Sequence, residues 1–454
     1  MTYLLTRESS SDEHRNLRAF CIIDVNGDAT TYAKSRHFNK KRSKQNTIYL
    51  GSPIQEVVHG SEMFGLIAED GTFRVIKPNG RLIKKVRRKK TSEKVIGAAM
   101  STAAYVYLQD DGFAYSGGRD ISGGRLDKSG ETNDGYNMSE LMGGSVVDIV
   151  STDNAFVALL DDFFAGVPGL RGGLKGDKSN LWGWPKDSWG GDVLDVQGIF
   201  NKLWTNRFAV VGRRADGSVE VWGHKGFGGH LDPEEADSIK EGGIVDVVAT
   251  STAFAAITQD GPVVTWGDRG NGGDFQGETK LYSNDVDDLI ASDSAFLALK
   301  NNGRVVAWGN ASTGGKIPRK FRDQLTGIEH IHASNYGFVA ITDDQAFSWG
   351  SPYIHKQIIQ LPENHTVEKV VASSEAFAIM TTQGAVLTWG KSDVGGRPMK
   401  SIRADLHSGI KDIASTYGSM AAITHSGDIL AWGDSDFGGK TERFTPATPA
   451  SYFG

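Results

Sequence analysis

The sequence predicts an all-β protein in which short strands form repeated, radially packed units. The dipeptide Trp-Gly closes seven similar units, at Trp182, Trp222, Trp266, Trp308, Trp349, Trp389 and Trp432. Equivalent positions in successive units lie 39 to 52 residues apart, the length of one four-stranded blade. The 57 glycines among 454 residues suit many short strands joined by tight turns. We therefore expect a β-propeller.

Each unit has the same internal order. Three strands are expected at, for example, 244–248, 254–258 and 263–266, with room for a less regular outer strand. The second strand begins with a bulky residue, at Phe20, Phe64, Tyr105, Phe156, Phe208, Phe254, Phe296, Phe338, Phe377 and Met420. These residues and the Trp of each Trp-Gly are expected to fill the space between neighbouring blades, because one aromatic side chain buries a large apolar area.

Glycine marks the turns of each unit. Asn-Gly or Asp-Gly, as at Asp70-Gly71 and Asn302-Gly303, predicts a two-residue hairpin between the second and third strands. A double glycine, as at Gly272-Gly273, follows most Trp-Gly pairs and predicts a repeated tight loop. These glycine pairs return about once per blade, unlike the nine-residue period of calcium-binding β-rolls, so they do not imply calcium.

The first three units lack Trp-Gly and end instead near Tyr32, Ile76 and Tyr115. Seven complete units favour a seven-bladed propeller, since propellers typically have four to eight blades. The three degenerate units are then expected to form a separate β region packed on the seven-bladed ring, and the alternative is that they add blades to a larger ring. The expected domains are an N-terminal degenerate-repeat region at 1–143, the Trp-Gly propeller at 144–440 and a tail at 441–454.

Composition limits the cellular compartments in which we expect this protein. Cys21 is the single cysteine, so no intrachain disulfide can form. No apolar run is long enough for a transmembrane helix, and the polar start lacks the apolar core of a signal peptide. We expect a soluble protein that is cytoplasmic or exported without a classical signal peptide, and nuclear targeting in a eukaryotic host is compatible with its basic clusters.

Charge is distributed unevenly. Residues 1–100 carry 19 Lys and Arg against 10 Asp and Glu, whereas the remaining residues carry 30 against 45. The positive charge gathers at 36–44 and at 81–90, the latter containing Lys84, Lys85, Arg87, Arg88, Lys89 and Lys90. Such clusters bind nucleic acid or anionic membranes, or they are solvated loops between strands.

No residue pattern points to catalysis. The sequence contains no zinc-protease His-Glu pair, P-loop, nucleophile elbow or Cys-His spacing, so we expect neither an enzyme nor a cofactor. His330 and His332 share one face of a strand, and His224 and His230 flank a Gly-rich loop. No acidic or Cys ligand is spaced to complete a metal site, which favours ordinary surface or core histidines.

The fourth unit departs most from the repeat. The segment 161–176 replaces its two-residue turn and predicts a projecting loop, and loops on rigid scaffolds often carry recognition. Exposed aromatic and Arg side chains are common interface anchors. The candidate binding residues in and beyond this loop are Phe163, Phe164, Leu170, Arg171, Trp184 and Trp189. The alternative is that Phe163, Phe164 and Trp184 fold back to fill a gap between blades.

The repeat resembles that of the regulator of chromosome condensation family. The resemblance rests on Phe-Ala-Ala-Ile-Thr-Gln-Asp-Gly-Pro-Val-Val-Thr-Trp-Gly at 254–267, followed by Gly272-Gly273, and it extends over 144–440. It implies a seven-bladed β-propeller. The family's His before the second strand is absent, and its Gly-Gln-Leu-Gly is reduced to Gly-Gly. The chain is therefore similar to a diverged branch of that family.

Three functions are compatible with these patterns. The favoured one is a non-enzymatic scaffold that binds a protein partner through a propeller face and the 161–176 loop, with the basic clusters contacting anionic groups. The family resemblance implies an alternative, guanine-nucleotide exchange on a small GTPase with the loop as a wedge. A secreted toxin, effector or glycan-binding protein is the third, because shallow sites between blades suit sugars.

Overall fold

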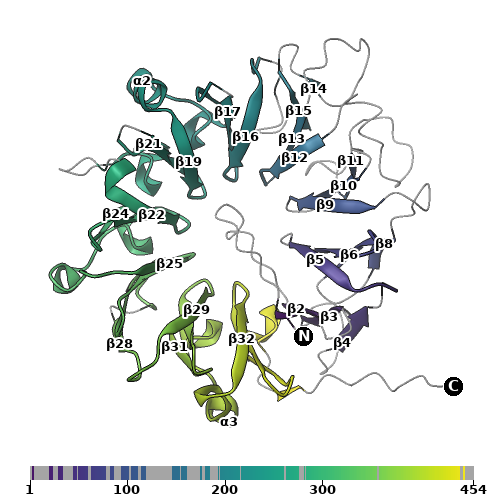
Figure 1. Cartoon of the computed structure of the whole chain (residues 1–454), viewed down its shortest axis with the longest axis vertical. Helices are drawn as coiled ribbons and strands as arrows, with labels where there is room; N and C mark the ends of the chain where they lie inside the picture. The colour runs from purple at the N-terminus through teal and green to yellow at the C-terminus, as the bar shows by residue number, and fades with distance from the viewer. Residues whose placement is uncertain are drawn as a thin grey trace.

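The computed structural model places ten small antiparallel sheets around one centre (Figure 1). It describes residues 3–4, 20–23, 29–33, 44–48, 50–59, 63–77, 82–85, 94–101, 104–110, 114–118, 146–153, 155–160, 174–175, 179–184, 193, 195–214, 216–259, 262–275, 281, 283–354, 357–439 and 443–444. Within these residues, every sheet is built from strands that are consecutive in the chain. The predicted all-β propeller fold is confirmed.

The strands occupy equivalent places in each sheet. The inner strands are β1 (Tyr3–Leu4), β5 (Ile54–His59), β9 (Val95–Met100), β12 (Val146–Ser151), β16 (Phe200–Thr205), β19 (Ile244–Ala249), β22 (Val286–Ala291), β25 (His330–Ser334), β29 (Val367–Ala372) and β32 (Ile410–Ser415). The second strands are β2 (Phe20–Ile23), β6 (Phe64–Ala68), β10 (Ala104–Gln109), β13 (Phe156–Leu160), β17 (Ala209–Arg214), β20 (Ala253–Thr258), β23 (Ala295–Lys300), β26 (Gly337–Ile341), β30 (Ala376–Thr381) and β33 (Ser419–Thr424).

The third strands are β3 (Ala29–Ala33), β7 (Phe73–Ile76), β11 (Ala114–Gly118), β15 (Leu181–Trp184), β18 (Val219–Gly223), β21 (Val264–Gly267), β24 (Val305–Gly309), β27 (Gln345–Gly350), β31 (Val386–Gly390) and β34 (Ile429–Gly433). Five sheets have an outer strand among the described residues: β4 (Lys44–Ile48), β8 (Leu82–Lys85), β14 (Leu174–Lys175), β28 (Gln357–Gln360) and β35 (Arg443–Phe444).

The three N-terminal units form sheets of the same kind and lie in the same circle as the Trp-Gly units (Figure 1). Along the circle β5 lies against β9, and β9 against β12. The first and last sheets also meet, because β1 lies against β32. In the described residues these sheets therefore continue the series of Trp-Gly sheets, whereas the sequence favoured a separate β region, with additional blades as the alternative. The number of blades and the domain boundary at 143 stay predictions. A short strand can join the ring without a Trp, since the hydrogen-bond ladder depends on backbone groups.

Aromatic side chains fill the space between neighbouring sheets. The Phe at the start of a second strand stacks on the Trp that pairs with it, with ring centroids 5.3 Å apart for Phe254 and Trp266 and 5.7 Å apart for Phe377 and Trp389. Trp266 is completely buried, and Trp389 is 4% exposed. The prediction that the repeat tryptophans are core residues is confirmed for Trp222, Trp266, Trp308, Trp349, Trp389 and Trp432, and the side chain of Trp182 lies outside the described residues.

Glycines lie in the predicted hairpin turns, but these turns have three residues and not the expected two. Ala68 N donates to Thr72 O at 2.9 Å, and Lys300 N donates to Arg304 O at 2.7 Å. The last residue of each turn, Gly71 or Gly303, has a positive φ of 78° or 71°, a conformation that residues with a Cβ rarely adopt. After most Trp-Gly pairs a short 3₁₀ turn ends at the first residue of the double glycine. These turns are η2 (Lys225–Phe227), η3 (Arg269–Asn271), η5 (Ala311–Thr313), η7 (Ser392–Val394) and η9 (Ser435–Phe437).

The double-glycine loop of one sheet binds the Trp of the next. The indole Nε1 of Trp266 donates to the carbonyl oxygen of Gly228 at 3.1 Å. The same bond joins Trp308 to Gly272, Trp349 to Gly314 and Trp432 to Gly395. The repeat is thus a mechanism for joining sheets, because the loop supplies an acceptor and the next sheet supplies the donor.

The ladder corrects one assignment made from the sequence, that of Phe208 to the start of a second strand. Val210 pairs with Trp222, whereas Phe254 pairs with Trp266, so Val210 and not Phe208 holds the equivalent position. Phe208 lies in the preceding loop, where its ring packs against Phe227. An aromatic beside a small residue was the sequence signal, and it cannot distinguish a strand start from a neighbouring loop.

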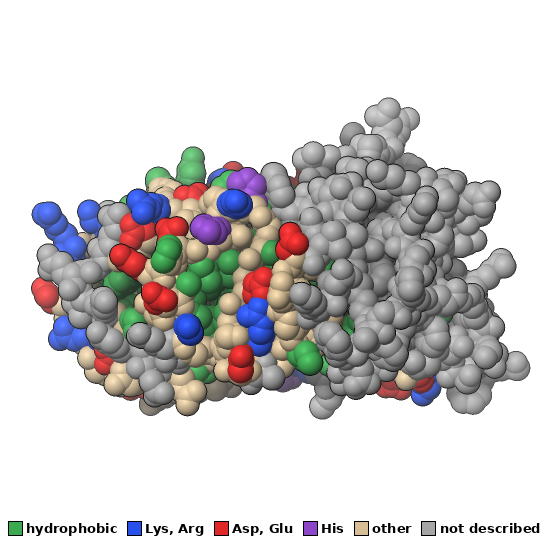
Figure 2. Space-filling model, turned by 90° about the horizontal axis from the view of Figure 1, so that it is seen from above, with side chains coloured by type: hydrophobic (Ala, Val, Ile, Leu, Met, Phe, Trp, Pro, Cys, Tyr) green, Lys and Arg blue, Asp and Glu red, His purple; other side chains and the backbone are tan. Residues whose placement is uncertain are grey.

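The helices lie outside the sheets. The longer one, α2 (Pro233–Gly242), begins with a capping box between Asp232 and Glu235, and Figure 1 shows it at the outer edge of the ring. The other helical segments are α3 (Lys400–Arg403), η4 (Ser283–Asp285), η6 (Arg319–Phe321) and η8 (Asp405–His407). None of the described helices is long and apolar enough to span a membrane. Seen on edge, the described wall carries Lys, Arg, Asp and Glu side chains close to one another (Figure 2).

Candidate functional site

Most of the residues predicted to bind a partner lie outside the described part of the chain. This applies to Phe163, Phe164, Leu170, Arg171 and Trp189 of the loop region, and to Arg87, Arg88, Lys89 and Lys90 of the basic cluster. Lys84 and Lys85 are the last two residues of the outer strand β8. Of the 161–176 segment, Leu174 and Lys175 form β14, which pairs with β15. These site residues therefore stay predictions.

Trp184 is the one aromatic candidate whose backbone is placed. It ends β15 and pairs with Phe156, which is the register position that Trp266 has opposite Phe254. Trp182, the tryptophan of the expected Trp-Gly, lies two residues before Trp184 on β15 and pairs with Ala158. The backbone position of Trp184 is thus that of a repeat tryptophan.

The two histidine pairs do not gather metal ligands. The His224 ring stacks on Phe227 at 4.2 Å. His330 is exposed, whereas burial, together with the charge of His330, lowers the pKa of His332 to about 4. Among the residues that the structure describes, no group of three or more His, Cys, Asp or Glu side chains could hold a metal ion.

One end of the ring is formed by the loops between first and second strands and by the loops that follow Trp-Gly. We call this end the Trp-Gly face. Backbone hydrogen bonds join its loops from sheet to sheet, as in Ser251 N to Asp293 O at 3.0 Å, Asp293 N to Asn335 O at 3.0 Å and Ser374 N to Tyr417 O at 2.9 Å. Side chains on these loops therefore sit on a connected platform.

The repeat breaks on this face after Trp349. The loop 351–354 reads Ser-Pro-Tyr-Ile and lacks the double glycine. Ile354 is fully buried in the same apolar cluster as Phe377 and Trp389. Trp389 Nε1, whose counterparts bind a glycine carbonyl of the preceding sheet, is buried and has no hydrogen-bond partner in the described part of the chain. The missing double glycine therefore changes the loop and also removes the Trp-to-glycine hydrogen bond between these two neighbouring sheets.

A connected group of side chains surrounds the break. Glu375, which is 9% exposed, accepts a hydrogen bond from Ser351 Oγ at 2.9 Å. Its second carboxylate oxygen accepts from Lys391 Nζ, also at 2.9 Å. The same ammonium group lies 4.6 Å from the centre of the Tyr353 ring. The hydrogen bond to Glu375 raises the pKa of Lys391, so the ammonium keeps its charge.

Two further tyrosines extend this group across the face. The hydroxyls of Tyr336 and Tyr417 lie 3.0 Å apart, although the sheet that carries Glu375 separates their own sheets in the chain. This hydrogen bond and burial raise the pKa of Tyr336. The Tyr417 ring packs against Phe437 at 5.5 Å. We call Tyr336, Tyr353, Glu375, Lys391 and Tyr417 the tyrosine site.

The tyrosine site presents aromatic surface and fixed polar groups to solvent. Tyr353 is 53% exposed, and among the described residues it is the one aromatic side chain in the set of exposed large hydrophobic residues. Its neighbours Lys391 and Glu375 hold each other by an ion pair in which the carboxylate is only 11% exposed. Sequence reasoning missed this site. The signal was present in the sequence, because the unit that ends at Trp349 is the one Trp-Gly unit that no double glycine follows.

Among known proteins, this chain is similar to several solved structures at low sequence identity. No protein-family model matches the sequence, and no curated protein matches it. Prp20p of Saccharomyces cerevisiae, described with its binding to Gsp1p and histones, is 18% identical, with 51% of this chain and 71% of that chain covered and a TM-score of 0.34. The ectodomain of the Arabidopsis thaliana receptor kinase ACR4 is 12% identical, with 83% and 93% covered and a TM-score of 0.32. Human WBSCR16 is 13% identical, with 87% and 95% covered and a TM-score of 0.37.

Proposed function

We propose that this chain is a non-enzymatic protein-binding scaffold that docks a protein partner on its Trp-Gly face. The observation that carries the proposal is Tyr353, an exposed aromatic residue on the loop where the repeat breaks. Tyrosine is enriched at interface hot spots because it offers a large contact area at a small entropic cost.

The surroundings of Tyr353 support this role. Lys391 lies against one side of its ring and is held by Glu375, which Ser351 also contacts. The Tyr336 and Tyr417 hydroxyls add donors and acceptors that are already paired. A site whose side chains are fixed before binding loses less conformational freedom on association, which favours affinity.

The predictions from the sequence extend the proposed interface. The 161–176 loop, with Phe163, Phe164, Leu170 and Arg171, is proposed as a second contact for the partner. The basic cluster at 81–90 is proposed to contact anionic groups. The Trp-Gly repeat supports the proposal that the chain belongs to a diverged branch of the regulator of chromosome condensation family. It also supports the proposal that the chain is a binding scaffold of that type.

A quantitative pull-down with mass spectrometry from host lysate tests the proposal. The baits are the intact chain, Tyr353→Ser, a chain with 163–176 replaced by a short turn, and a chain with Lys84, Lys85, Arg87 and Arg88 neutralised. Ile358→Ser is the matched control, because Ile358 is 42% exposed and lies on β28 of the same sheet. The partner is then purified, and its affinity is measured for each variant.

We expect one stoichiometric protein partner whose binding weakens by about 30-fold with Tyr353→Ser, a loss of about 2 kcal/mol. The control is expected to bind like the intact chain. Retention of every partner by Tyr353→Ser contradicts the assignment of the tyrosine site. If the partner is a small GTPase whose GDP is released catalytically, the conclusion that the chain is non-enzymatic is wrong.

A further inference from the structure

The opposite end of the ring carries a repeated irregularity of its own. In eight sheets the ladder between the inner and second strands slips by one residue after the first residue of the inner strand. Such a β-bulge leaves one residue unpaired and redirects its side chain. We call the bulged residue and the residue after it in these eight sheets, together with Ile199 directly before β16, the bulge rim.

Neighbouring sheets present apolar side chains on this rim. The bulged residues Ile96 of β9, Val147 of β12 and Val245 of β19 are 57%, 56% and 49% exposed. Ile199, directly before β16, is 51% exposed and lies between them in the order of sheets. In other sheets the bulged residue is polar or charged, at Gln55, Asn201, Asp287, Glu368 and Lys411. The bulge does not require an apolar side chain, because five of the eight bulged residues are polar or charged. We call Ile96, Val147, Ile199 and Val245 the apolar arc.

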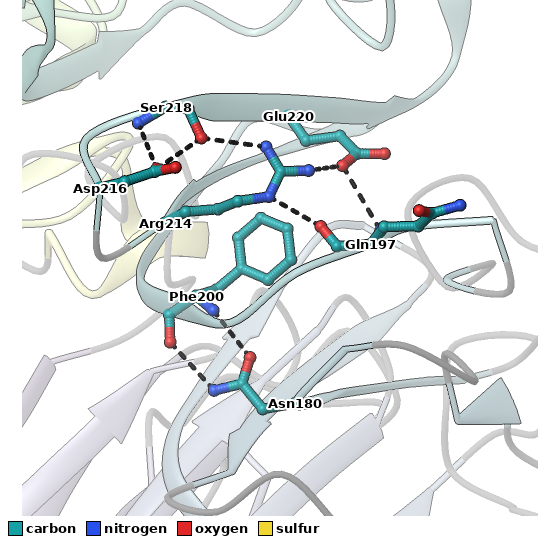
Figure 3. A network of polar contacts seen from close by, with 7 residues as sticks. All are labelled: Asn180, Gln197, Phe200, Arg214, Asp216, Ser218 and Glu220. Atoms are coloured by element: carbon teal, nitrogen blue, oxygen red, sulfur yellow. Dashed lines mark hydrogen bonds and ion pairs between the residues drawn. The ribbon is translucent and has the colours of Figure 1, made fainter.

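A polar network fixes the segment that carries Ile199 (Figure 3). The Arg214 guanidinium donates from Nε to the carbonyl oxygen of Gln197 at 2.7 Å and pairs with Glu220. It also lies 4.9 Å from the centre of the Phe200 ring. On the other side of the chain, Asn180 Oδ1 accepts from the Phe200 amide at 2.8 Å. Ile199 is therefore held exposed between two anchored residues.

The bulge rim is acidic. Its described residues include seven carboxylates, at Glu56, Asp148, Asp246, Asp287, Asp288, Glu368 and Asp412, against three lysines, at Lys202, Lys369 and Lys411. Two lysines are committed to neighbouring sheets, because Lys202 pairs with Asp246 at 3.0 Å and Lys369 with Asp412 at 2.7 Å. Outside these two pairs the rim keeps five carboxylates and Lys411, and the Arg213 guanidinium beside the carbonyl oxygen of Val245 adds one positive charge, so the balance stays negative. Asp148 and Asp287 are exposed beside the apolar arc.

We propose that the bulge rim binds a basic protein segment with interspersed apolar side chains. The apolar side chains would cover Ile96, Val147, Ile199 and Val245, and the Lys or Arg groups would face Asp148 and Asp287. The excess of carboxylates disfavours nucleic acid and anionic lipid, whose phosphates carry the same sign of charge. This surface lies at the other end of the inner strands from the tyrosine site, and the two proposals stand independently.

Selection of phage-displayed random 12-residue peptides on the immobilised full chain tests the proposal. We expect enriched peptides to combine Lys or Arg with apolar residues. The affinity of one enriched peptide, labelled with fluorescein, is then measured by anisotropy against the full chain and its variants. Val147→Ser with Val245→Ser removes apolar contacts, and Asp148→Asn with Asp287→Asn removes charge. Ile358→Ser with Met399→Ser is the control, because both residues are exposed apolar positions elsewhere.

The serine pair on the rim is expected to weaken binding at least about tenfold, because two partly buried contacts are lost. The asparagine pair is expected to weaken it less and to reduce its dependence on salt. Tyr353→Ser and the control pair are expected to leave it unchanged, which separates this surface from the tyrosine site. The proposal is overturned if no such peptides are enriched, or if the control pair weakens binding as much as the rim variants.

Discussion

Replacing a repeat tryptophan by phenylalanine is expected to have different costs at two otherwise similar positions. Trp266 and Trp389 are both buried, and each stacks on a Phe at an interplanar angle of 24°. Trp266 Nε1 donates to Gly228 O, whereas Trp389 Nε1 has no partner among the described residues. The pair therefore separates the hydrogen bond from the packing.

The magnitude follows from this comparison. Both substitutions shrink a buried side chain by a similar volume, so the cavity term cancels in the difference. Trp266→Phe loses a hydrogen bond worth about 1 kcal/mol and leaves a carbonyl without its donor. Trp389→Phe removes a buried donor whose burial without a partner costs about 1–3 kcal/mol. We expect Trp266→Phe to be the more destabilising by about 2 kcal/mol.

Urea unfolding of the full chain, followed by far-ultraviolet circular dichroism, measures the difference, with Trp308→Phe as a second hydrogen-bonded case. If unfolding occurs in several steps, amide exchange in the affected sheets gives the local free energies instead. Equal costs for Trp266→Phe and Trp389→Phe would refute the view that the double-glycine loop acts as an acceptor for the next sheet.

Three further outcomes are expected. Gly314→Ala should destabilise by about 1–3 kcal/mol, because φ is 106° and a Cβ would lie 2.5 Å from Phe338, whereas Gly226→Ala, with its nearest contact at 3.5 Å, should change stability little in the same urea assay. Asp412→Asn should cost about 1 kcal/mol by breaking the half-buried pair with Lys369, and the cost should shrink in 1 M salt; a cost independent of salt would exclude the ion pair as its cause. His332 binds its proton below about pH 6.5 in the unfolded chain but only near pH 4 in the folded chain, so the unfolded chain holds more protons between these pH values. The free energy of unfolding should therefore fall as the pH decreases from about 6.5 to about 4, by at most about 1.4 kcal/mol per pH unit from this residue. In His332→Gln, unfolding curves measured over the same pH range should show a smaller fall.

The sequence predicts the parts of this fold that depend on local chemistry. The hairpin at Asp70-Gly71 follows from the need for positive φ, and burial of Trp266 follows from its size and its place in the repeat. Phe208 shows the limit of this reasoning. Phe208 is an aromatic residue beside an alanine, which is the pattern at the start of other second strands. In the hydrogen-bond ladder, however, Val210 is the residue that pairs with the repeat tryptophan Trp222.

The candidate sites were harder to predict, for physical reasons. Glu375 looks like any polar loop residue until the fold brings Ser351 and Lys391 to its carboxylate. The exposure of Val147 and Val245 comes from a bulge, which an apolar residue at the start of a strand does not reveal. The 161–176 loop was recognisable as an interruption, and its role as a binding element stays a prediction.

The way the circle closes has a consequence for how such a chain can change. Each sheet is made of consecutive strands, and in the described residues β1 packs against β32 while no strand is shared between the last sheet and the first. Gain or loss of one unit leaves every other sheet intact and alters only the angle at which neighbours meet. Duplication or deletion of a blade is therefore a small step for this architecture, and three units without Trp-Gly can stand beside seven that keep it.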